Sequence, residues 1–337
     1  MKSRMPRFVV GSSLLLSGLA GAQDYQWTEI VIQGATVLQA WQINDQVQVA
    51  LSTTDGRSGI YGDGTFTPLP TLEGFQVYAF GINNDDVITG SATDPAGIQQ
   101  GFILHGSTYT LFSRQGWDNT QPRAIANSGL ITGYSFASGG SPAAGFIYNP
   151  VTDRFTDATP PGSTDTLTQG MNTFGIITGQ AGDSVIGPYG FVWQQETITE
   201  GKRELLPFLD RIKIDATTAT RGINDSGVVV GWIRDATGRY DGIVGSNAQG
   251  YQRLVAPGGE PPNSTICQGI NSLAQVVYYV WDPASTPLGA FIGSPVKGGG
   301  NADSSSHAAP TRDTASSGAP EWTNKSRGEL VIPTMRP

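Results

Sequence analysis

Cysteine and histidine are nearly absent from this chain of 337 residues, which contains one Cys and two His. A single cysteine cannot form an intramolecular disulfide. No His or basic residue adjoins Cys267 in sequence, so we expect a small buried side chain rather than a reactive thiol. With only His105 and His307, the chain has no His-rich metal site, and a Ser-His-Asp triad would need one of these two residues. We therefore expect no metal and no cofactor.

Other sequence signatures of catalysis are missing as well. The chain has no Gly-x-Ser-x-Gly turn, no Walker-type phosphate loop and no Cys-x-x-Cys pair. Catalysis is therefore not evident, and a binding protein is favoured over an enzyme. A carbohydrate-active enzyme that uses Asp or Glu side chains from different parts of the fold stays open as the alternative, because a spatial carboxylate pair has no sequence signature.

Charged residues are scarce, and most of them are acidic. They make up 14% of the chain, and the formal net charge is −8. The first 22 residues carry three positive charges and no negative one, so the rest of the chain is more acidic still. Such a surface is repelled by nucleic-acid phosphates and anionic lipids. This composition excludes nucleic acid as an expected partner.

A long apolar run occurs only at the N-terminus. Lys2, Arg4 and Arg7 precede the apolar residues 8–22, which end on the small residues Ala-Gly-Ala. This pattern is typical of a secretory signal peptide, and the run is too short and too interrupted to favour a membrane span. We predict a leader over residues 1–22, with an uncleaved anchor as the alternative. The mature protein is expected to be a secreted, periplasmic or cell-envelope monomer without a membrane span.

Glycine is abundant, with 45 residues, and much of it belongs to a repeated motif. The pattern Gly-Ile-Asn-x-x-Gly-x-Val-x-Gly, or a close variant, begins at positions 42, 81, 124, 170, 222 and 269. Successive copies are 39, 43, 46, 52 and 47 residues apart. Six near-regular copies indicate a repeat architecture, so the fold should be built from six similar units.

Turn chemistry explains the motif. Asn in its third position suits the start of a β-turn, where the side chain bonds the backbone two residues on. Gly in its sixth position suits the end of such a turn or a bulge. The apolar residues that follow, as in 228–230, predict a strand buried on both faces. The third copy departs from the pattern because Ala126 occupies the Asn position.

Each copy continues with two more expected strands. The first contains Gly-Phe or a related pair, and the second follows after a short turn, at residues 65–70, 108–113, 154–159, 203–208 and 251–256. Four strands in 39 to 52 residues are typical of a β-propeller blade. We therefore assign residues 23–296 to one propeller domain.

The two ends of the repeat region predict how the ring closes. The sixth copy lacks a last strand, whereas residues 25–35 resemble one and precede the first copy. The prediction is an all-β, six-bladed β-propeller of four-stranded blades in which the N-terminal strand completes the last blade. Closure would remove the exposed edges of an open sheet. An open β-solenoid or two sandwiches are the alternatives.

The motif, together with the Gly/Ala-Phe-Ile/Val strand that follows it, resembles the HAF family of probable extracellular repeat proteins. The resemblance covers about residues 41–295. It implies an exported, propeller-like protein and no particular activity. The His that is typical of the family is replaced here by Gln100, Ala144, Tyr189, Asp241 and Gly289. Any role of that His is therefore not expected in this chain.

Candidate ligand-binding residues follow the second strand of several units, where propeller loops vary on a rigid scaffold. They are aromatic or Arg side chains, types that are enriched in binding sites, namely Tyr134, Trp232, Arg234, Tyr279 and Trp281. The alternative is that the aromatic ones pack between blades. We expect a secreted binding or interaction module that recognises a protein or glycan through this loop face. A structural envelope protein is a third interpretation.

Residues 297–337 differ in composition from the rest. They begin with a segment rich in Gly, Ser and Ala, which predicts a disordered C-terminal tail, and end with a short segment in which Trp322 and other apolar residues return. A docking or sorting peptide and a frayed terminus are both compatible with this ending.

Overall fold

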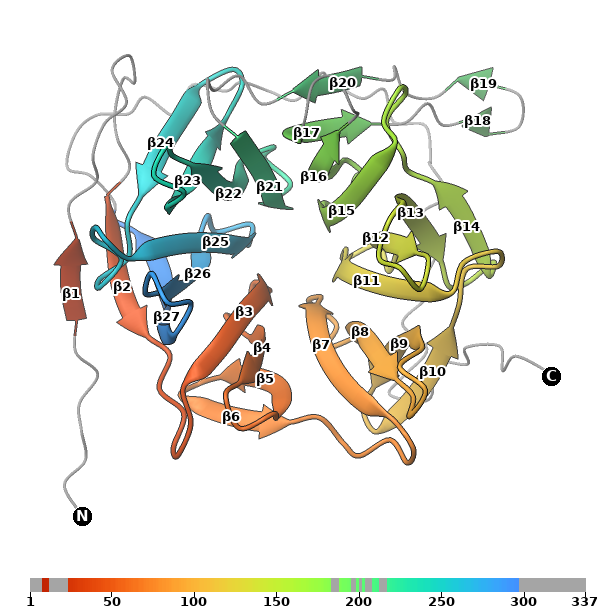
Figure 1. Cartoon of the computed structure of the whole chain (residues 1–337), viewed down its shortest axis with the longest axis horizontal. Coiled ribbons are helices and arrows are strands. Elements are labelled where there is room, and N and C mark those ends of the chain that lie inside the picture. The colour runs from red at the N-terminus through yellow and green to blue at the C-terminus, as the bar shows by residue number, and fades with distance from the viewer. Residues whose placement is uncertain are drawn as a thin grey trace.

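The computed structural model describes residues 8–11, 24–182, 188–194, 198–199, 202–203, 208–211 and 217–296. These residues form β-strands and turns and contain no helix, so no helix among them is long and apolar enough to cross a membrane. Six antiparallel blades of four strands each are arranged radially around a central axis (Figure 1). The predicted six-bladed β-propeller is confirmed. The predicted C-terminal tail and most of the predicted leader lie outside the described residues.

The strands follow the chain from the inside of each blade to the outside. Blade 1 consists of β3 (Val37–Ile43), β4 (Val49–Thr53), β5 (Ser58–Gly62) and β6 (Thr65–Pro68), and blade 2 of β7 (Gln76–Ile82), β8 (Ile88–Thr93), β9 (Gln99–His105) and β10 (Thr108–Phe112). Blade 3 consists of β11 (Asn119–Ile125), β12 (Ile131–Phe136), β13 (Ala143–Asn149) and β14 (Arg154–Asp157). Blade 4 consists of β15 (Asp165–Met171), β16 (Ile177–Gly182), β17 (Tyr189–Gln194) and β20 (Phe208–Arg211). Blade 5 consists of β21 (Thr217–Ile223), β22 (Val229–Arg234), β23 (Tyr240–Ser246) and β24 (Gly250–Leu254). Blade 6 consists of β25 (Ser264–Ile270), β26 (Val276–Trp281), β27 (Pro287–Pro295) and, from the start of the chain, β2 (Tyr25–Glu29).

The N-terminal strand closes the ring as predicted. β2 pairs with β27 along its whole length, so residues from both ends of the described chain share blade 6. The Trp27 ring packs over Gly293, where an added Cβ would lie 2.3 Å from a ring carbon, and meets Tyr278 edge-on at 5.0 Å. The short strand β1 (Phe8–Gly11) pairs with the outer side of β2. Removal of the predicted leader would take β1 away and leave blade 6 with four strands.

Blade 4 differs from the prediction in its outer strand. We expected this strand at residues 203–208, but β20 spans Phe208–Arg211 and pairs with β17. A small hairpin of β18 (Ile198–Thr199) and β19 (Lys202–Arg203) lies between β17 and β20 in the chain. This insertion lengthens the connection between the third and fourth strands, which accounts for the wide spacing between the fourth and fifth motif copies.

The second strand is buried on both faces in blades 1, 5 and 6, as its apolar sequence predicted, whereas β12 and β16 leave two residues of one face partly exposed. All residues of β4 are buried, and in β22 and β26 only the last residue is not. Neighbouring blades share these surfaces, so the apolar core consists of several clusters around the ring rather than one central cluster. Cys267 is fully buried in one of them, and burial raises the pKa of its thiol, in agreement with the expectation of an inert side chain.

The motif Asn residues stabilise their own turns. The side-chain oxygen of Asn83 accepts hydrogen bonds from the backbone N–H groups of Asp85 and Val87, both at 3.0 Å. Asn172, Asn224 and Asn271 make the same pair of bonds in their turns. The predicted turn role of Asn is thereby confirmed.

The same Asn residues also connect neighbouring blades, which the sequence analysis did not foresee. The side-chain nitrogen of each Asn donates to the backbone oxygen at the equivalent position of the next blade. These bonds run from Asn44 to Asn83, from Asn83 to Ala126, from Asn172 to Asn224, from Asn224 to Asn271 and from Asn271 back to Asn44. Ala126 lacks a side-chain amide and interrupts the circle between blades 3 and 4. We call this set the asparagine ring.

The sixth motif position has a left-handed backbone whether or not it is glycine. Gly227 has φ of 76°, and Ala274, which occupies the same position in the last copy, has φ of 56°. An L-residue pays a steric cost in this region that glycine does not pay. Copies with another residue at this position therefore have a locally strained backbone.

We expect Asn271→Ala to lower the free energy of unfolding by about 2 kcal/mol, because it leaves buried backbone groups of two blades without partners. Urea unfolding of the propeller would measure this. Asn271→Asp is the matched variant, since its carboxylate keeps the turn acceptor but cannot donate to Asn44 O. An aspartate variant as stable as the wild type would show that the closing bond contributes nothing.

Replacing glycine by alanine at the sixth motif position should lower stability, and replacing alanine by glycine there should raise it. Gly227→Ala should lower stability by about 1 kcal/mol through its φ alone, since no atom lies within 4 Å of the added Cβ. Ala274→Gly should raise stability by about 0.5 kcal/mol for the converse reason. Thermal or urea unfolding of both variants would test this, and a stabilising Gly227→Ala would contradict it.

Candidate binding site in the central channel

Each innermost strand contains a backbone irregularity just before the motif turn. In five of the six, one residue is left out of the pairing with the second strand, as Arg123 is between Pro122 and Ala124. In β3 the irregularity spans two residues, Trp41 and Gln42. A bulge of this kind redirects a side chain and is common beside functional sites. The residues at this position are Trp41, Phe80, Arg123, Gln169, Arg221 and Gln268, which we call the bulge ring.

Five of the six bulge-ring residues line one cavity inside the propeller, together with the residues that follow them in the motif. The cavity has a volume of about 20 Å³ and is open to solvent. The innermost strands can converge here because the first motif position is glycine in four of the six copies. A Cβ on Gly269, for example, would lie 2.4 Å from the backbone oxygen of Trp41 in the next blade. Among the described residues, no Asp or Glu lines this cavity.

Arg123 is held between apolar rings and an amide. Its side chain is only 9% exposed, and its guanidinium carbon lies 4.0 Å from the centre of the Trp41 ring and 4.7 Å from that of Phe80. Its Nε donates to the side-chain oxygen of Gln169 at 2.8 Å. Cation–π contacts recover part of the hydration that the guanidinium loses. Arg123 forms no ion pair with any described residue.

Arg221 is less well satisfied. Its guanidinium carbon lies 5.8 Å from the centre of the Trp232 ring, and its Nε is buried with no hydrogen-bond partner. No described Asp or Glu forms an ion pair with it. The indole N–H of Trp41, in the same bulge ring, is likewise buried without a partner. The cavity wall therefore contains two buried N–H donors that no acceptor satisfies.

The two arginines share one electrostatic environment. Burial lowers the pKa of Arg123 to about 10, the hydroxyls of Tyr134 and Tyr279 oppose this shift, and the charge of Arg221 adds to it. Burial also lowers the pKa of Arg221, against the influence of the same two tyrosines and of Tyr240. Three predicted site residues, Tyr134, Trp232 and Tyr279, thus lie around the arginines of the channel.

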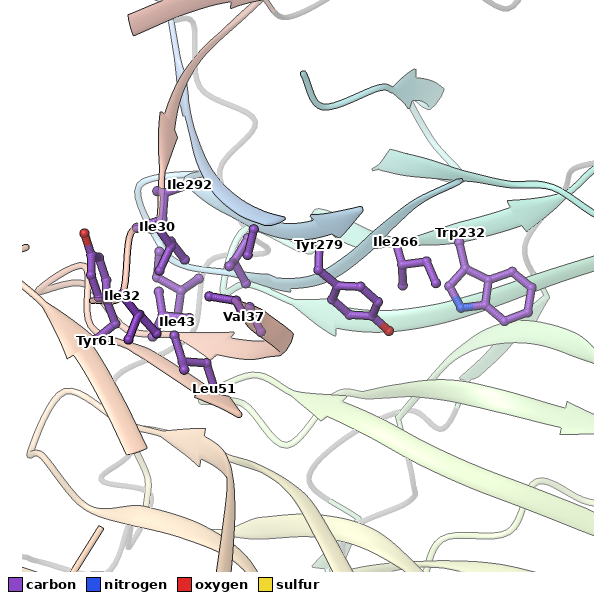
Figure 2. Close-up of a cluster of buried hydrophobic side chains, with 14 of the residues drawn as sticks. Ile30, Ile32, Val37, Ile43, Leu51, Tyr61, Trp232, Ile266, Tyr279 and Ile292 are labelled. Atoms are coloured by element: carbon purple, nitrogen blue, oxygen red, sulfur yellow. The ribbon is translucent and has the colours of Figure 1, made fainter. Parts of the chain in front are cut away.

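Trp232 and Tyr279 are buried, at 8% and 4% exposure, in an apolar cluster with Ile266 (Figure 2). Trp281 is partly buried against the same cluster, and its indole N–H donates to the backbone oxygen of Leu38. Tyr279 OH accepts a hydrogen bond from the side-chain nitrogen of Gln268, a bulge-ring residue. The aromatic candidates therefore pack between blades and contribute to the wall behind the channel, and their ligand-binding role stays a prediction.

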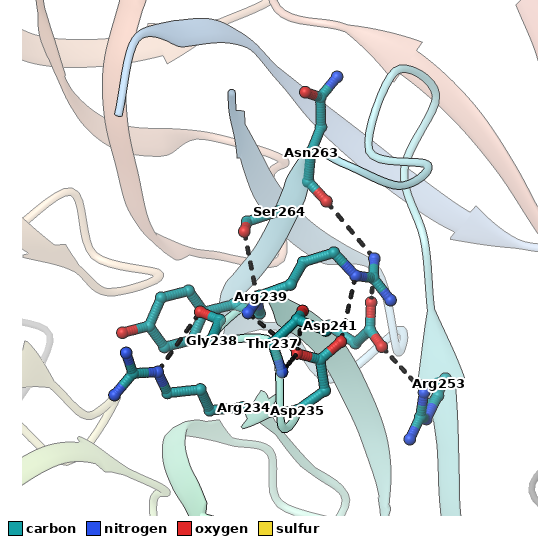
Figure 3. Close-up of polar contacts among 10 residues, drawn as sticks. Arg234, Asp235, Thr237, Gly238, Arg239, Asp241, Arg253, Asn263 and Ser264 are labelled. Atoms are coloured by element: carbon teal, nitrogen blue, oxygen red, sulfur yellow. Dashed lines mark hydrogen bonds and ion pairs between the residues drawn. The ribbon is translucent and has the colours of Figure 1, made fainter. Parts of the chain in front are cut away.

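Arg234 is the exposed member of the predicted set and lies at the start of the loop between β22 and β23 (Figure 3). Its Nε donates to Gly238 O at 3.4 Å, and its guanidinium lies over the Tyr240 ring at 5.6 Å. Beyond this loop, the buried Asp241 pairs with Arg239 at 2.6 Å and Arg253 at 3.0 Å. Two arginines thus neutralise Asp241, whereas neither arginine of the channel has a described carboxylate partner.

The loop carboxylates that an enzyme would need are engaged in turns. Asp94, Asp235 and Asp282 each accept two backbone N–H bonds within their own loop. Asp183, the corresponding residue of blade 4, lies outside the described residues. No group of three or more His, Cys, Asp or Glu side chains that could hold a metal ion occurs in the described part of the chain.

A second cavity opens among the motif turns beside the first, and both cavities are lined by Gln42, Met171, Ile223 and Ile270. Asp45 and Asp225 line it, and each accepts a hydrogen bond from the turn of a neighbouring blade, Asp45 from Ser272 N and Asp225 from Thr173 N. Burial disfavours the charge of Asp45, but hydrogen bonds from Asn84 and Ser272 outweigh it and lower its pKa. These carboxylates connect blades.

Sequence reasoning missed Arg123 and Arg221. The signal was present in the motif alignment, one position before the first motif residue, where four of six copies have Arg or Gln and two have an aromatic residue. This position precedes the repeated motif turn, and nothing in its spacing indicates that a bulge directs its side chain into the channel.

No family model matches the chain, and no curated protein matches its sequence. Solved structures do match its fold. A gluconolactonase from Xanthomonas campestris has 9% sequence identity and a TM-score of 0.51, over 87% of this chain and 100% of that one. TolB from Acinetobacter baumannii has 11% identity and a TM-score of 0.47, over 83% and 66% of the two chains. The Aleuria aurantia lectin bound to Fucα1-6GlcNAc has 11% identity and a TM-score of 0.46, over 82% and 99%. At such identities these similarities concern the fold alone.

Asp45→Asn should reduce the dependence of stability on acid pH. Because the folded-state pKa of Asp45 is lowered, its charge stabilises the protein above about pH 4 and loses this effect as pH falls through the folded-state value. The variant should be less stable by under 1 kcal/mol at pH 7, since the group is partly exposed, and equal to the wild type near pH 2. Urea unfolding at both pH values would show this. An equal difference at both would contradict it.

Proposed function

We propose that the chain is an exported binding module that recognises a glycan or protein ligand at its central channel. The observation that supports this most directly is the cavity in which Arg123, Arg221, Gln169 and Gln268 converge beside aromatic rings with no carboxylate of the described chain among them. Hydrogen-bonding and aromatic groups on a rigid concave wall are typical of ligand sites.

The fold itself does not distinguish binding from catalysis, because a gluconolactonase has a similar one. The site favours binding. Hydrolysis of a glycoside by paired carboxylates needs one proton donor and one nucleophile or base near the bond to be cleaved. The described loop carboxylates serve their own turns instead, and arginine and glutamine supply no such pair.

Three finer features belong to the same proposal. The predicted leader sends the chain out of the cytoplasm, the mature propeller acts as a monomer, and the repeat motif relates it to the HAF family. The loop residues Arg234 and Trp281 would extend the ligand contact from the channel to the surface.

The proposed function would be tested with residues 23–296 on a glycan array and in a pull-down from the cell envelope and culture medium of the source organism. A ligand should bind this propeller, and Arg234→Ala and Trp281→Phe should each weaken binding about tenfold, the effect of losing one good contact. Leu273→Ala is the control, because Leu273 is 57% exposed on the opposite, turn end of blade 6. Equal loss of binding in all three variants, or no ligand in either experiment, would contradict the proposal.

A further inference from the structure

Two guanidinium groups without counter-charges face one cavity in a protein whose net charge is −8. Burial of an unpaired charge is costly, and two like charges in one channel repel each other. Asp241, a buried carboxylate elsewhere in the described chain, is paired with two arginines. A purely structural role would not explain why the channel arginines lack such partners.

The two buried side-chain atoms of the cavity wall that lack a hydrogen-bond partner are both donors. The buried Nε of Arg221 and the buried indole N–H of Trp41 have no partner, and Gln169 uses its oxygen for Arg123, which leaves its amide nitrogen as a further donor. A wall that is positive and rich in donors fits an anion with several acceptor oxygens. Guanidinium groups bind such oxygens in a planar, two-bond geometry.

We propose that the bulge ring binds the carboxylate group of an organic ligand, with Arg123 and Arg221 as the charged contacts and Trp41 Nε1 as an additional donor. Trp41 and Phe80 flank Arg123, so the positive charge is presented beside apolar surface. This suits a carboxylate attached to a carbon body better than inorganic phosphate, which keeps water on all sides. The site goes beyond the proposed function, since a free small carboxylate could occupy it without a larger partner.

Isothermal titration calorimetry of the full chain with sodium glucuronate would test the site, with glucose as the neutral counterpart and inorganic phosphate as the inorganic anion. Glucuronate should bind, glucose should not, and phosphate should bind at least tenfold more weakly. Arg221→Gln and Arg123→Gln should each weaken glucuronate binding about tenfold to a hundredfold, the effect of losing a charged hydrogen bond. Arg57→Gln, which changes an exposed arginine paired with Asp55, should bind like the wild type.

A stability measurement separates this site from a structural role. Without added anion, Arg221→Gln should melt at the same temperature as the wild type or higher, because one of two repelling charges is gone. With glucuronate, the wild type should gain melting temperature and Arg221→Gln should gain little, since a ligand stabilises only the state that binds it.

Several results would overturn the inference. They are an anion-free Arg221→Gln protein that melts well below the wild type, a glucuronate effect equalled by sodium chloride of the same ionic strength, and affinities unchanged in both channel variants. Equal binding of phosphate would overturn the assignment of an organic carboxylate. A failed glycan array with a positive glucuronate titration would reject the proposed macromolecular ligand and leave the channel site standing.

Discussion

The hydrogen bond from the motif Asn to the backbone of the next blade is the interaction that five of the six blade junctions share. One amide serves two purposes, because its oxygen holds its own turn and its nitrogen reaches the neighbouring turn. The bond from Asn271 to Asn44 joins residues 227 positions apart and closes the circle beside the shared blade. Repetition of a local motif is thereby converted into a fixed number of blades.

A closed ring of this kind brings six equivalent positions close to one axis. The turns repeat nearly the same residues because each must make the same bonds, whereas the bulge position just before them is free of pairing and varies from Trp to Phe, Arg and Gln. The turn residues and the bulge residues are therefore adjacent in sequence, but only the turn residues are constrained by hydrogen bonds between blades. Gln42 illustrates the boundary, since its side chain spans from blade 1 to bond both backbone groups of Ile125 in blade 3.

Basic and acidic side chains line neighbouring parts of the channel. Asp45 and Asp225 line the cavity among the motif turns and are held by hydrogen bonds between blades, while Arg123 and Arg221 line the adjoining cavity without a described acidic partner. The two guanidinium groups therefore form a local concentration of positive charge inside a chain of net negative charge. An anionic ligand would be repelled by the general surface and attracted only at the channel, which favours selectivity over nonspecific adhesion.

The sequence by itself determined the six repeats, their four strands, the Asn turns and the completion of the last blade by β2, because turn chemistry and short apolar runs are local and were repeated six times. It misplaced the outer strand of blade 4, where the inserted hairpin shifts the pairing by several residues. Only the tertiary structure decided that Trp232 and Tyr279 pack between blades and that Arg123 and Arg221 meet across the channel. Their encounter depends on the bulges and on ring closure, which bring together residues nearly a hundred positions apart, and no spacing in the sequence encodes that distance.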